Sequence, residues 1–185
     1  MRALARMKFS LIFLILSIPF LLSSSGFAKS YLFNPLNQPN AQDWRVFRNA
    51  TPTEQQAIYK SFEAQGFHFE NWHWAWRVGF LQTCHLDGAL SCLTLISKGL
   101  NDEAVVVRAE AATRLAQVAS PSDSQALALL TKAYQNKNNW RAGQPLFIQF
   151  RILDAIRKFD DPTVSVILKR FANDHPVIAN YLKSR

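Results

Sequence analysis

Apolar residues recur at helical spacing along most of the chain. In "TPTEQQAIYKSFEAQG", the side chains of Ala57, Ile58 and Phe62 fall on one helical face. Thr51 and Thr53 are alternative N-cap residues for this helix, because a threonine hydroxyl can accept a hydrogen bond from the first turn. Strand patterns are sparse in the rest of the chain, so we expect an all-α fold.

Two sets of three similar stretches alternate along the chain. The first set is "WAWRVGFLQ", "VVVRAEAAT" and "IQFRILDAI", which align on Arg77, Arg108 and Arg151. The second set is "LISKGLND", "LLTKAYQN" and "ILKRFAND". The turn signals "HLDG", "ASPSDS" and "FDDPT" separate the two members of each pair. The pattern therefore predicts three helical hairpins that stack as an α-solenoid.

The spacing of these units is irregular in one place. Arg77 and Arg108 are separated by 31 residues, and Arg108 and Arg151 by 43. The polar stretch "QNKNNWRAGQP", which contains Trp140, accounts for the difference and is expected to be a loop. At the C-terminus, "NDHPVIANYLK" starts like "NDEAVVVRAEA" and stops early, which predicts a capping half-repeat. We expect residues 51–185 to form one repeat domain, with an N-terminal helix ahead of the hairpins.

These units resemble HEAT-like repeats of the short bacterial, phycobilisome-lyase-type class. The resemblance rests on "VVVRAEAATRLA", preceded by "NDEA", and on "DDPTVSVILKRF", and it covers roughly residues 71–185. The family's acidic residue ahead of the arginine is present as Asp102, whereas Asn71 and Pro145 stand at the equivalent places of the other units. The resemblance implies an α-solenoid that binds other proteins, and some relatives assist chromophore attachment. It implies no catalytic residue.

The first 28 residues follow the three-part pattern of a secretory signal peptide. The basic stretch "MRALARMK" precedes the apolar run "FSLIFLILSIPFLL", and the small residues of "SSSGFA" place the cleavage after Ala28. We therefore expect a periplasmic or secreted protein, and an uncleaved anchor is the alternative. The apolar run is short for a membrane span and contains Pro19, so no stable span is expected once the signal is removed.

Residues 29–50 are rich in Asn, Gln and Pro. Pro35 and Pro39 argue against a helix, so this segment is expected to be an extended lead-in.

The charge of the chain gives little information on the partner. The formal net charge is +8, and three of these positive charges lie in the signal peptide, which leaves +5 on the mature chain. The basic residues are spread along the sequence, which favours solubility or attraction to an acidic surface over nucleic-acid binding. We expect a monomer whose partner is another protein.

The aromatic segment "GFHFENWHWAWRVGF" is a candidate binding site. Trp72, Trp74 and Trp76 cannot all point inward on one helix, so one of them is expected on the surface. There it could hold a protein side chain or a glycan. The alternative is that these side chains seal the first repeat against the N-terminal helix.

The aligned arginines allow two interpretations as well. Arg77, Arg108 and Arg151 could bind carboxylates of a partner, or they could tie neighbouring units together through carbonyl and carboxylate oxygens. Their equivalent positions favour the second interpretation. The candidate binding residues are Trp72, Trp74, Trp76, Arg77, Arg108, Arg151 and Trp140.

Cys84 and Cys92 lie on either side of the first predicted hairpin turn. In an exported protein this pair predicts a disulfide bond, and two reduced core residues are the alternative. His68 and His73 are five residues apart and have no carboxylate cluster nearby, so we expect no metal and no cofactor. Catalytic motifs are absent, which favours a binding or scaffold protein over an enzyme. The alternatives are a lyase-like cofactor-attachment factor and a glycan binder.

Overall fold

The computed structural model describes residues 33–84 and 90–185, and these are mostly helical. The expected all-α fold is confirmed, with one small two-stranded hairpin in the described ranges. The elements are α1 (Ala41–Asn49), α2 (Pro52–Ala64), η1 (Phe69–Asn71), α3 (Trp74–Thr83), α4 (Leu90–Leu100), α5 (Val105–Val118), α6 (Ser124–Tyr134), η2 (Lys137–Asn139), β1 (Trp140–Arg141), β2 (Gln144–Pro145), α7 (Phe147–Ile156), α8 (Thr163–Ala172) and α9 (Pro176–Lys183). The predicted signal peptide, with its cleavage after Ala28, lies outside the described residues.

The expected extended lead-in is wrong for residues 41–49, because these residues form α1. Asn40 caps this helix by accepting hydrogen bonds from the backbone N–H groups of Gln42 and Asp43, and the Asp43 carboxylate accepts the Asn40 N–H at 2.9 Å. Such a reciprocal cap satisfies amide donors that would otherwise have no partner. The prolines at 35 and 39 precede the cap and therefore do not interrupt the helix.

Helix α2 begins where the sequence places it. Thr51 is the N-cap, Pro52 is the first helical residue, and Glu54 completes a second reciprocal cap. Ile58 and Phe62 are buried on the inner face of this helix.

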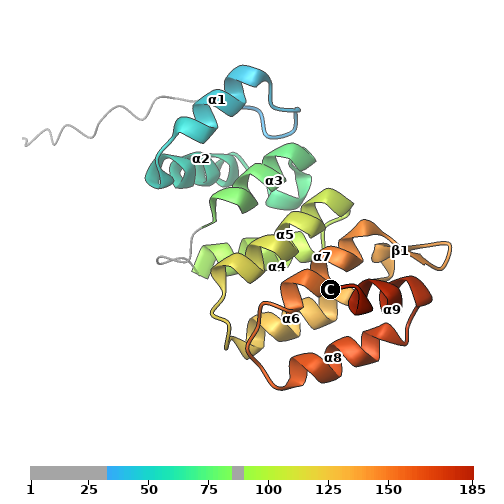
Figure 1. Cartoon of the computed structure of the whole chain (residues 1–185). Helices are drawn as coiled ribbons and strands as arrows, with labels where there is room; N and C mark the ends of the chain where they lie inside the picture. Colours follow the sequence, from blue (N-terminus) through green and yellow to red (C-terminus); the bar gives the residue numbers. More distant parts are fainter. Residues whose placement is uncertain (1–32, 85–89) are drawn as a thin grey trace, which may run out of the picture. The chain divides into compact units, whose positions relative to one another are not determined.

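Helices α3, α5 and α7 pack side by side, with α5 between the other two (Figure 1). Helix α4 packs against α3 and α5, and α6 packs against α4, α5 and α7. Helices α3 to α6 therefore each contact both their hairpin partner and a helix of the neighbouring unit. At the C-terminal end, α8 packs against α9. Within residues 33–84 and 90–185, no helix combines the length and the apolar character needed to cross a membrane.

A common burial pattern relates α3, α5 and α7. Each has a buried polar residue, and the residues one before it and three, four and seven after it are buried too. The polar residue is Arg77 in α3, Arg108 in α5 and Gln149 in α7. The predicted alignment on Arg151 is therefore two residues out of register in the third unit, and Arg151 is exposed.

Two of the tryptophans fill the core beneath the N-terminal helices. Trp72 and Trp76 are buried, and both rings contact Phe62 of α2 at centroid distances of 5.0 and 5.8 Å. Trp76 also contacts Phe47 of α1 edge-on at 5.7 Å. These two side chains therefore seal the first unit, as the alternative interpretation of the aromatic segment supposed.

The polar insert is more ordered than the expected loop. It forms η2 and then the hairpin β1–β2, in which Trp140 pairs with Pro145. Ala142 and Gly143 make the turn with φ values of 49° and 76°, the left-handed region that a two-residue hairpin turn of this kind requires.

Candidate functional site

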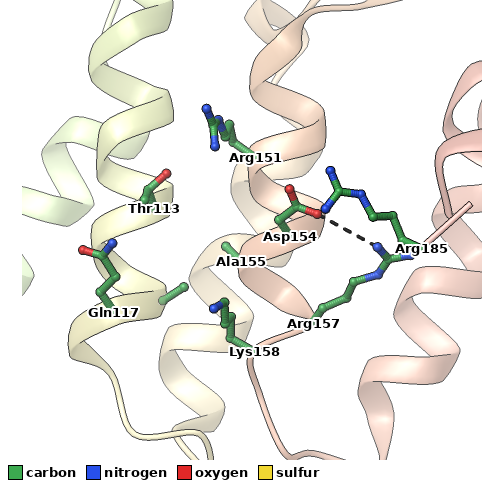
Figure 2. A pocket seen from close by; sticks show the side chains of 9 residues that line it. Thr113, Gln117, Arg151, Asp154, Ala155, Arg157, Lys158 and Arg185 are labelled. Carbon is green, nitrogen blue, oxygen red and sulfur yellow. Dashed lines mark ion pairs between the residues drawn. The ribbon is translucent and has the colours of Figure 1, made fainter.

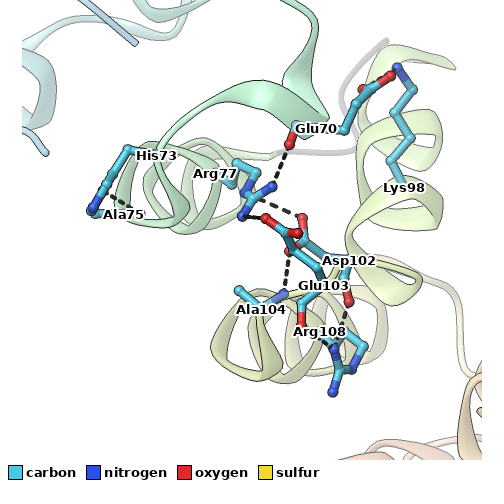
Figure 3. Close-up of polar contacts among 9 residues, drawn as sticks. All are labelled: Glu70, His73, Ala75, Arg77, Lys98, Asp102, Glu103, Ala104 and Arg108. Atoms are coloured by element: carbon cyan, nitrogen blue, oxygen red, sulfur yellow. Dashed lines mark hydrogen bonds and ion pairs between the residues drawn. The ribbon is translucent and has the colours of Figure 1, made fainter. Parts of the chain in front are cut away.

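Arg77 connects the start of α3 to the loop between α4 and α5. Its Nη1 donates a hydrogen bond to the carbonyl oxygen of Glu70 at 2.6 Å. Its Nε lies 3.3 Å from the Asp102 carboxylate, and its Nη2 lies 3.4 Å from the Glu103 carboxylate (Figure 3). The nitrogen atoms of this buried guanidinium therefore all face acceptors inside the protein.

Arg108 makes the equivalent connection one unit later. Its Nη1 donates to the carbonyl oxygens of Asp102 and Glu103 at 2.6 and 2.8 Å. Its Nε donates to Oδ1 of Asn139 at 2.7 Å, and its Nη2 donates to the carbonyl oxygen of Asn138 at 2.8 Å. The insert is therefore anchored to the core, because its buried Asn139 and the Asn138 carbonyl supply half of the partners of a buried cation.

Asp102 serves both arginines. Its backbone carbonyl accepts from Arg108, and its buried side chain faces Arg77 while Oδ1 accepts the Ala104 N–H at 2.8 Å. Burial raises the pKa of the Asp102 carboxyl, and the Ala104 N–H and the Arg77 guanidinium offset part of that shift. Arg77 and Arg108 thus have the connecting role considered for them, and neither is free to bind a partner.

Gln149 is the counterpart in the third unit, and the sequence alignment missed it. Its Nε2 donates to the Tyr134 carbonyl oxygen at 2.9 Å, which joins α7 to the end of α6. An uncharged amide is sufficient for this single bond.

Three candidate residues remain outside the core. Trp140 is partly exposed and packs edge-on against Tyr134 and His175 at centroid distances of 6.1 and 6.2 Å. Trp74 and Arg151 are exposed, and both line the same surface depression. The structure therefore brings together one predicted aromatic residue and one predicted arginine.

This depression belongs to a groove that runs over α3, α5, α7 and α9, which we call the α5–α7 groove. It consists of three adjoining depressions of about 330, 450 and 380 Å³, and Arg151 lines all of them. The apolar end of the groove is formed by the apolar side chains that line the first depression: Trp74, Val78, Val106, Ala109 and Phe147. The basic end of the groove is formed by the cations that line the second depression: Arg151, Arg157, Lys158 and Arg185.

The apolar end exposes large side chains to solvent. Trp74, Val106 and Phe147 are 45%, 40% and 48% exposed. They come from three different helices and line one depression, so the exposure is a shared patch and not three isolated side chains. Apolar patches of this kind mark interaction sites.

Two of the four cations of the basic end have no polar partner in the described part of the chain. The one acid there, Asp154, lies 4.0 Å from Arg157 (Figure 2). It also accepts a hydrogen bond from the Tyr181 hydroxyl at 2.7 Å. Among residues 33–84 and 90–185, Arg151 and Lys158 have no side-chain hydrogen bond or ion pair. This end of the groove is therefore suited to an anion.

The sequence contains a signal for the residues that were missed. Phe147, Arg151, Asp154 and Lys158 follow each other at intervals of four, three and four residues. This spacing places the first three on one face of α7, and Lys158 follows just beyond the end of the helix. Their meeting with Trp74, Val106 and Arg185 depends on how the helices pack.

The two cysteines are buried free thiols in the structure. A hydrogen bond with Cys92 and burial both raise the pKa of the Cys84 thiol, so the thiolate is disfavoured. The backbone carbonyl of Cys84 accepts a hydrogen bond from Arg114 Nε at 2.6 Å. The expected disulfide stays a prediction. No group of His, Cys, Asp and Glu side chains that could hold a metal ion occurs in the described part of the chain.

No family model, no curated protein and no solved structure matches the chain.

Proposed function

We propose that the chain is an exported protein-binding or scaffold module that uses the α5–α7 groove and catalyses no reaction. Its helical hairpins are proposed to be HEAT-like repeats stacked as an α-solenoid, with α9 as the capping half-repeat. In such an array each unit buries its faces against its neighbours, and the remaining surface is left for a partner. The packing of α3, α5 and α7 with one burial pattern supports this architecture.

One observation carries the proposed function: exposed apolar side chains adjoin unpaired cations in the same groove. A folded chain does not gain stability from leaving Trp74 and Phe147 in water, or from holding Arg151 and Lys158 without counter-charges. A protein partner would bury the former and neutralise the latter. The buried tryptophans and arginines make their contacts inside the protein, so they do not offer an alternative binding surface.

The alternatives have less support. A cofactor-attachment factor would need a reactive thiolate, but Cys84 is buried and its thiol pKa is raised. A glycan binder would need an open aromatic platform, and Trp74 is the one tryptophan in the described ranges that is largely exposed.

Site-specific photo-crosslinking in the intact cell envelope tests the proposal. A photoreactive phenylalanine analogue at Phe147 should form a discrete adduct with another protein, and the Arg151→Glu change in the same chain should abolish it. The same analogue at Val166, an exposed apolar residue of α8 outside the groove, is the matched control. Equal adducts at both positions, or none at Phe147, would argue against a binding groove. The mass of the purified protein tests export, because cleavage after Ala28 leaves a chain that begins at Lys29.

A further inference from the structure

The arrangement of the groove along α7 indicates what kind of segment would fit it. Phe147 is the first residue of α7, Arg151 lies about one turn later, and Lys158 lies just beyond the end of the helix. At about 1.5 Å of rise per residue, the apolar end and Lys158 are roughly 16 Å apart. An extended peptide covers that distance in about five residues.

The apolar character is confined to one end of the groove. A bound amphipathic helix would need apolar contacts over several turns. Beyond Arg151 the groove is lined by the basic end, with Thr113 and Gln117 of α5 on the opposite side. One anchoring side chain followed by polar groups therefore matches the groove better than a helical ligand does.

The charges of the basic end select an acidic segment. Four cations line the second depression together with one acid, and Asp154 already interacts with Arg157 and Tyr181. Arg185 lies over the Tyr181 ring at 5.4 Å, which holds its guanidinium near the groove. Arg151, Lys158 and Arg185 are thus available for carboxylates.

Accepting the proposed function, we infer that the α5–α7 groove binds an extended acidic segment of another protein. A bulky apolar side chain of that segment packs among Trp74, Val106 and Phe147. Its Asp or Glu side chains, about two and about five residues away, bind Arg151 and Lys158 respectively.

Direct binding of defined peptides tests this inference. Two labelled ten-residue peptides each carry one Phe and two Glu residues, with the Glu residues about two and five positions after the Phe in one and before it in the other. One of the two should bind the purified chain. Replacement of both Glu by Gln, or of the Phe by Ala, should weaken binding at least about tenfold, and binding should weaken as salt is raised from 50 to 200 mM.

Charge reversal in the protein gives the matched control. Arg151→Glu and Lys158→Glu should each weaken binding of the Glu peptide. The double variant should bind a peptide that has Lys in place of Glu. Lys60→Glu, an exposed change on α2 away from the groove, should have no effect. Rescue by the Lys peptide cannot arise from a folding defect, so it separates recognition from lost stability.

The outcomes separate the inference from the proposed function. If Phe147 forms its adduct in the envelope but neither peptide binds, or if Glu→Gln changes nothing, the acidic-segment inference is wrong and the groove still binds a protein. If polyglutamate without an apolar residue binds as tightly as the Phe peptide, the site is a general anion surface and the inference is wrong. If neither the adduct nor peptide binding is seen, both are wrong.

Discussion

Asp102 contacts both buried arginines, and its own side chain is buried with them. Its side chain faces Arg77 and its backbone carbonyl accepts from Arg108. Removing one partner of a buried charge pair is costly because the other charge is left without compensation. Burial also raises the pKa of this carboxyl, so the charged form is not strongly favoured by the fold.

The raised pKa predicts how stability depends on pH at Asp102. The Asp102 carboxyl binds its proton more tightly in the folded state than in the unfolded chain, so the protonated carboxyl contributes to stability. That contribution is fully present below the unfolded pKa of about 3.9 and is lost as pH rises through the higher folded pKa. Asp102→Asn is neutral at every pH and its Oδ1 can still accept the Ala104 N–H. The free energy of unfolding of the wild type, relative to Asp102→Asn, should therefore fall between pH 4 and pH 7 in urea titrations.

Asp102→Ala serves as the control for this comparison. It removes the acceptor of the Ala104 N–H as well as the charge, so it should lower the free energy of unfolding by about 1–3 kcal/mol across the range. A wild-type advantage over Asp102→Asn that grows with pH would mean that the ion pair with Arg77 outweighs the cost of burial.

Ala142 is held in a backbone conformation that its side chain disfavours. Its φ of 49° lies in the left-handed region, which costs an L-residue about 1 kcal/mol. Asn accepts this region more readily, and Ala142→Asn makes an Asn-Gly turn with Gly143. We expect this change to raise the free energy of unfolding by about 0.5–1 kcal/mol in urea titrations. Gly143→Ala should lower it, because φ there is 76° and an L side chain disfavours this conformation. The loss would come from the backbone alone, since the added methyl meets no atom beyond its chain neighbours within 4 Å.

At the scale of helices, the closeness of α4 and α5 depends on Gly99. A methyl group at this position would lie 2.9 Å from the Ala111 Cβ and 3.0 Å from Leu81 Cδ1. The first of these atoms is attached directly to the α5 backbone and cannot turn away. The small residue therefore sets how near the two helices approach.

A double-mutant cycle measures this contact. Gly99→Ala should lower the free energy of unfolding by about 1–3 kcal/mol through overpacking. Ala111→Gly removes the opposing methyl, so it should cost less in the Gly99→Ala background than in the wild type. Additive effects of the two changes would show that the backbones shift apart without strain.

Local sequence signals predict where most of the helices lie. They do not always predict which residue of a helix takes the buried polar position. Thr51 and the paired acid Glu54 mark the start of α2 in the sequence. Asn40 marks α1 in the same way, but the neighbouring prolines pointed to an extended chain. In α7, the alignment on arginine failed because the buried polar position needs only one hydrogen bond, which Gln149 supplies.

At the scale of the whole described chain, polar connections join successive units. Arg77 reaches the loop before α5, Arg108 reaches the insert after α6, and Arg157 Nη2 donates to the Leu182 carbonyl oxygen at 2.9 Å. The α5–α7 groove arises from the same packing, because its lining comes from four helices. No local pattern in the sequence specifies which side chains of different helices come together. For this reason the sequence names Trp74 and Arg151 as separate candidates and does not predict that they line one depression.

These connections predict that the units unfold together. Tryptophan fluorescence reports mainly on the N-terminal units, since Trp44, Trp72, Trp74 and Trp76 lie there, whereas circular dichroism reports on all helices. The two urea transitions should coincide, as in a two-state protein. Separate midpoints would show that neighbouring units are only weakly coupled.

The partners of Arg108 also bear on how the chain could be lengthened by design. Arg77 takes a carbonyl oxygen from the loop ahead of its own helix and the Asp102 and Glu103 side chains from the loop ahead of the next unit. Arg108 takes its carbonyls in the same way, but the insert takes the place of that second loop. In a tandem duplication of residues 102–137, the upstream copy of Arg108 would meet a second Asp102, and the downstream copy would keep Asn139. We therefore expect such a duplication to fold, because Asp102 and Glu103 of the second copy would replace Asn138 and Asn139 as acceptors for the first Arg108.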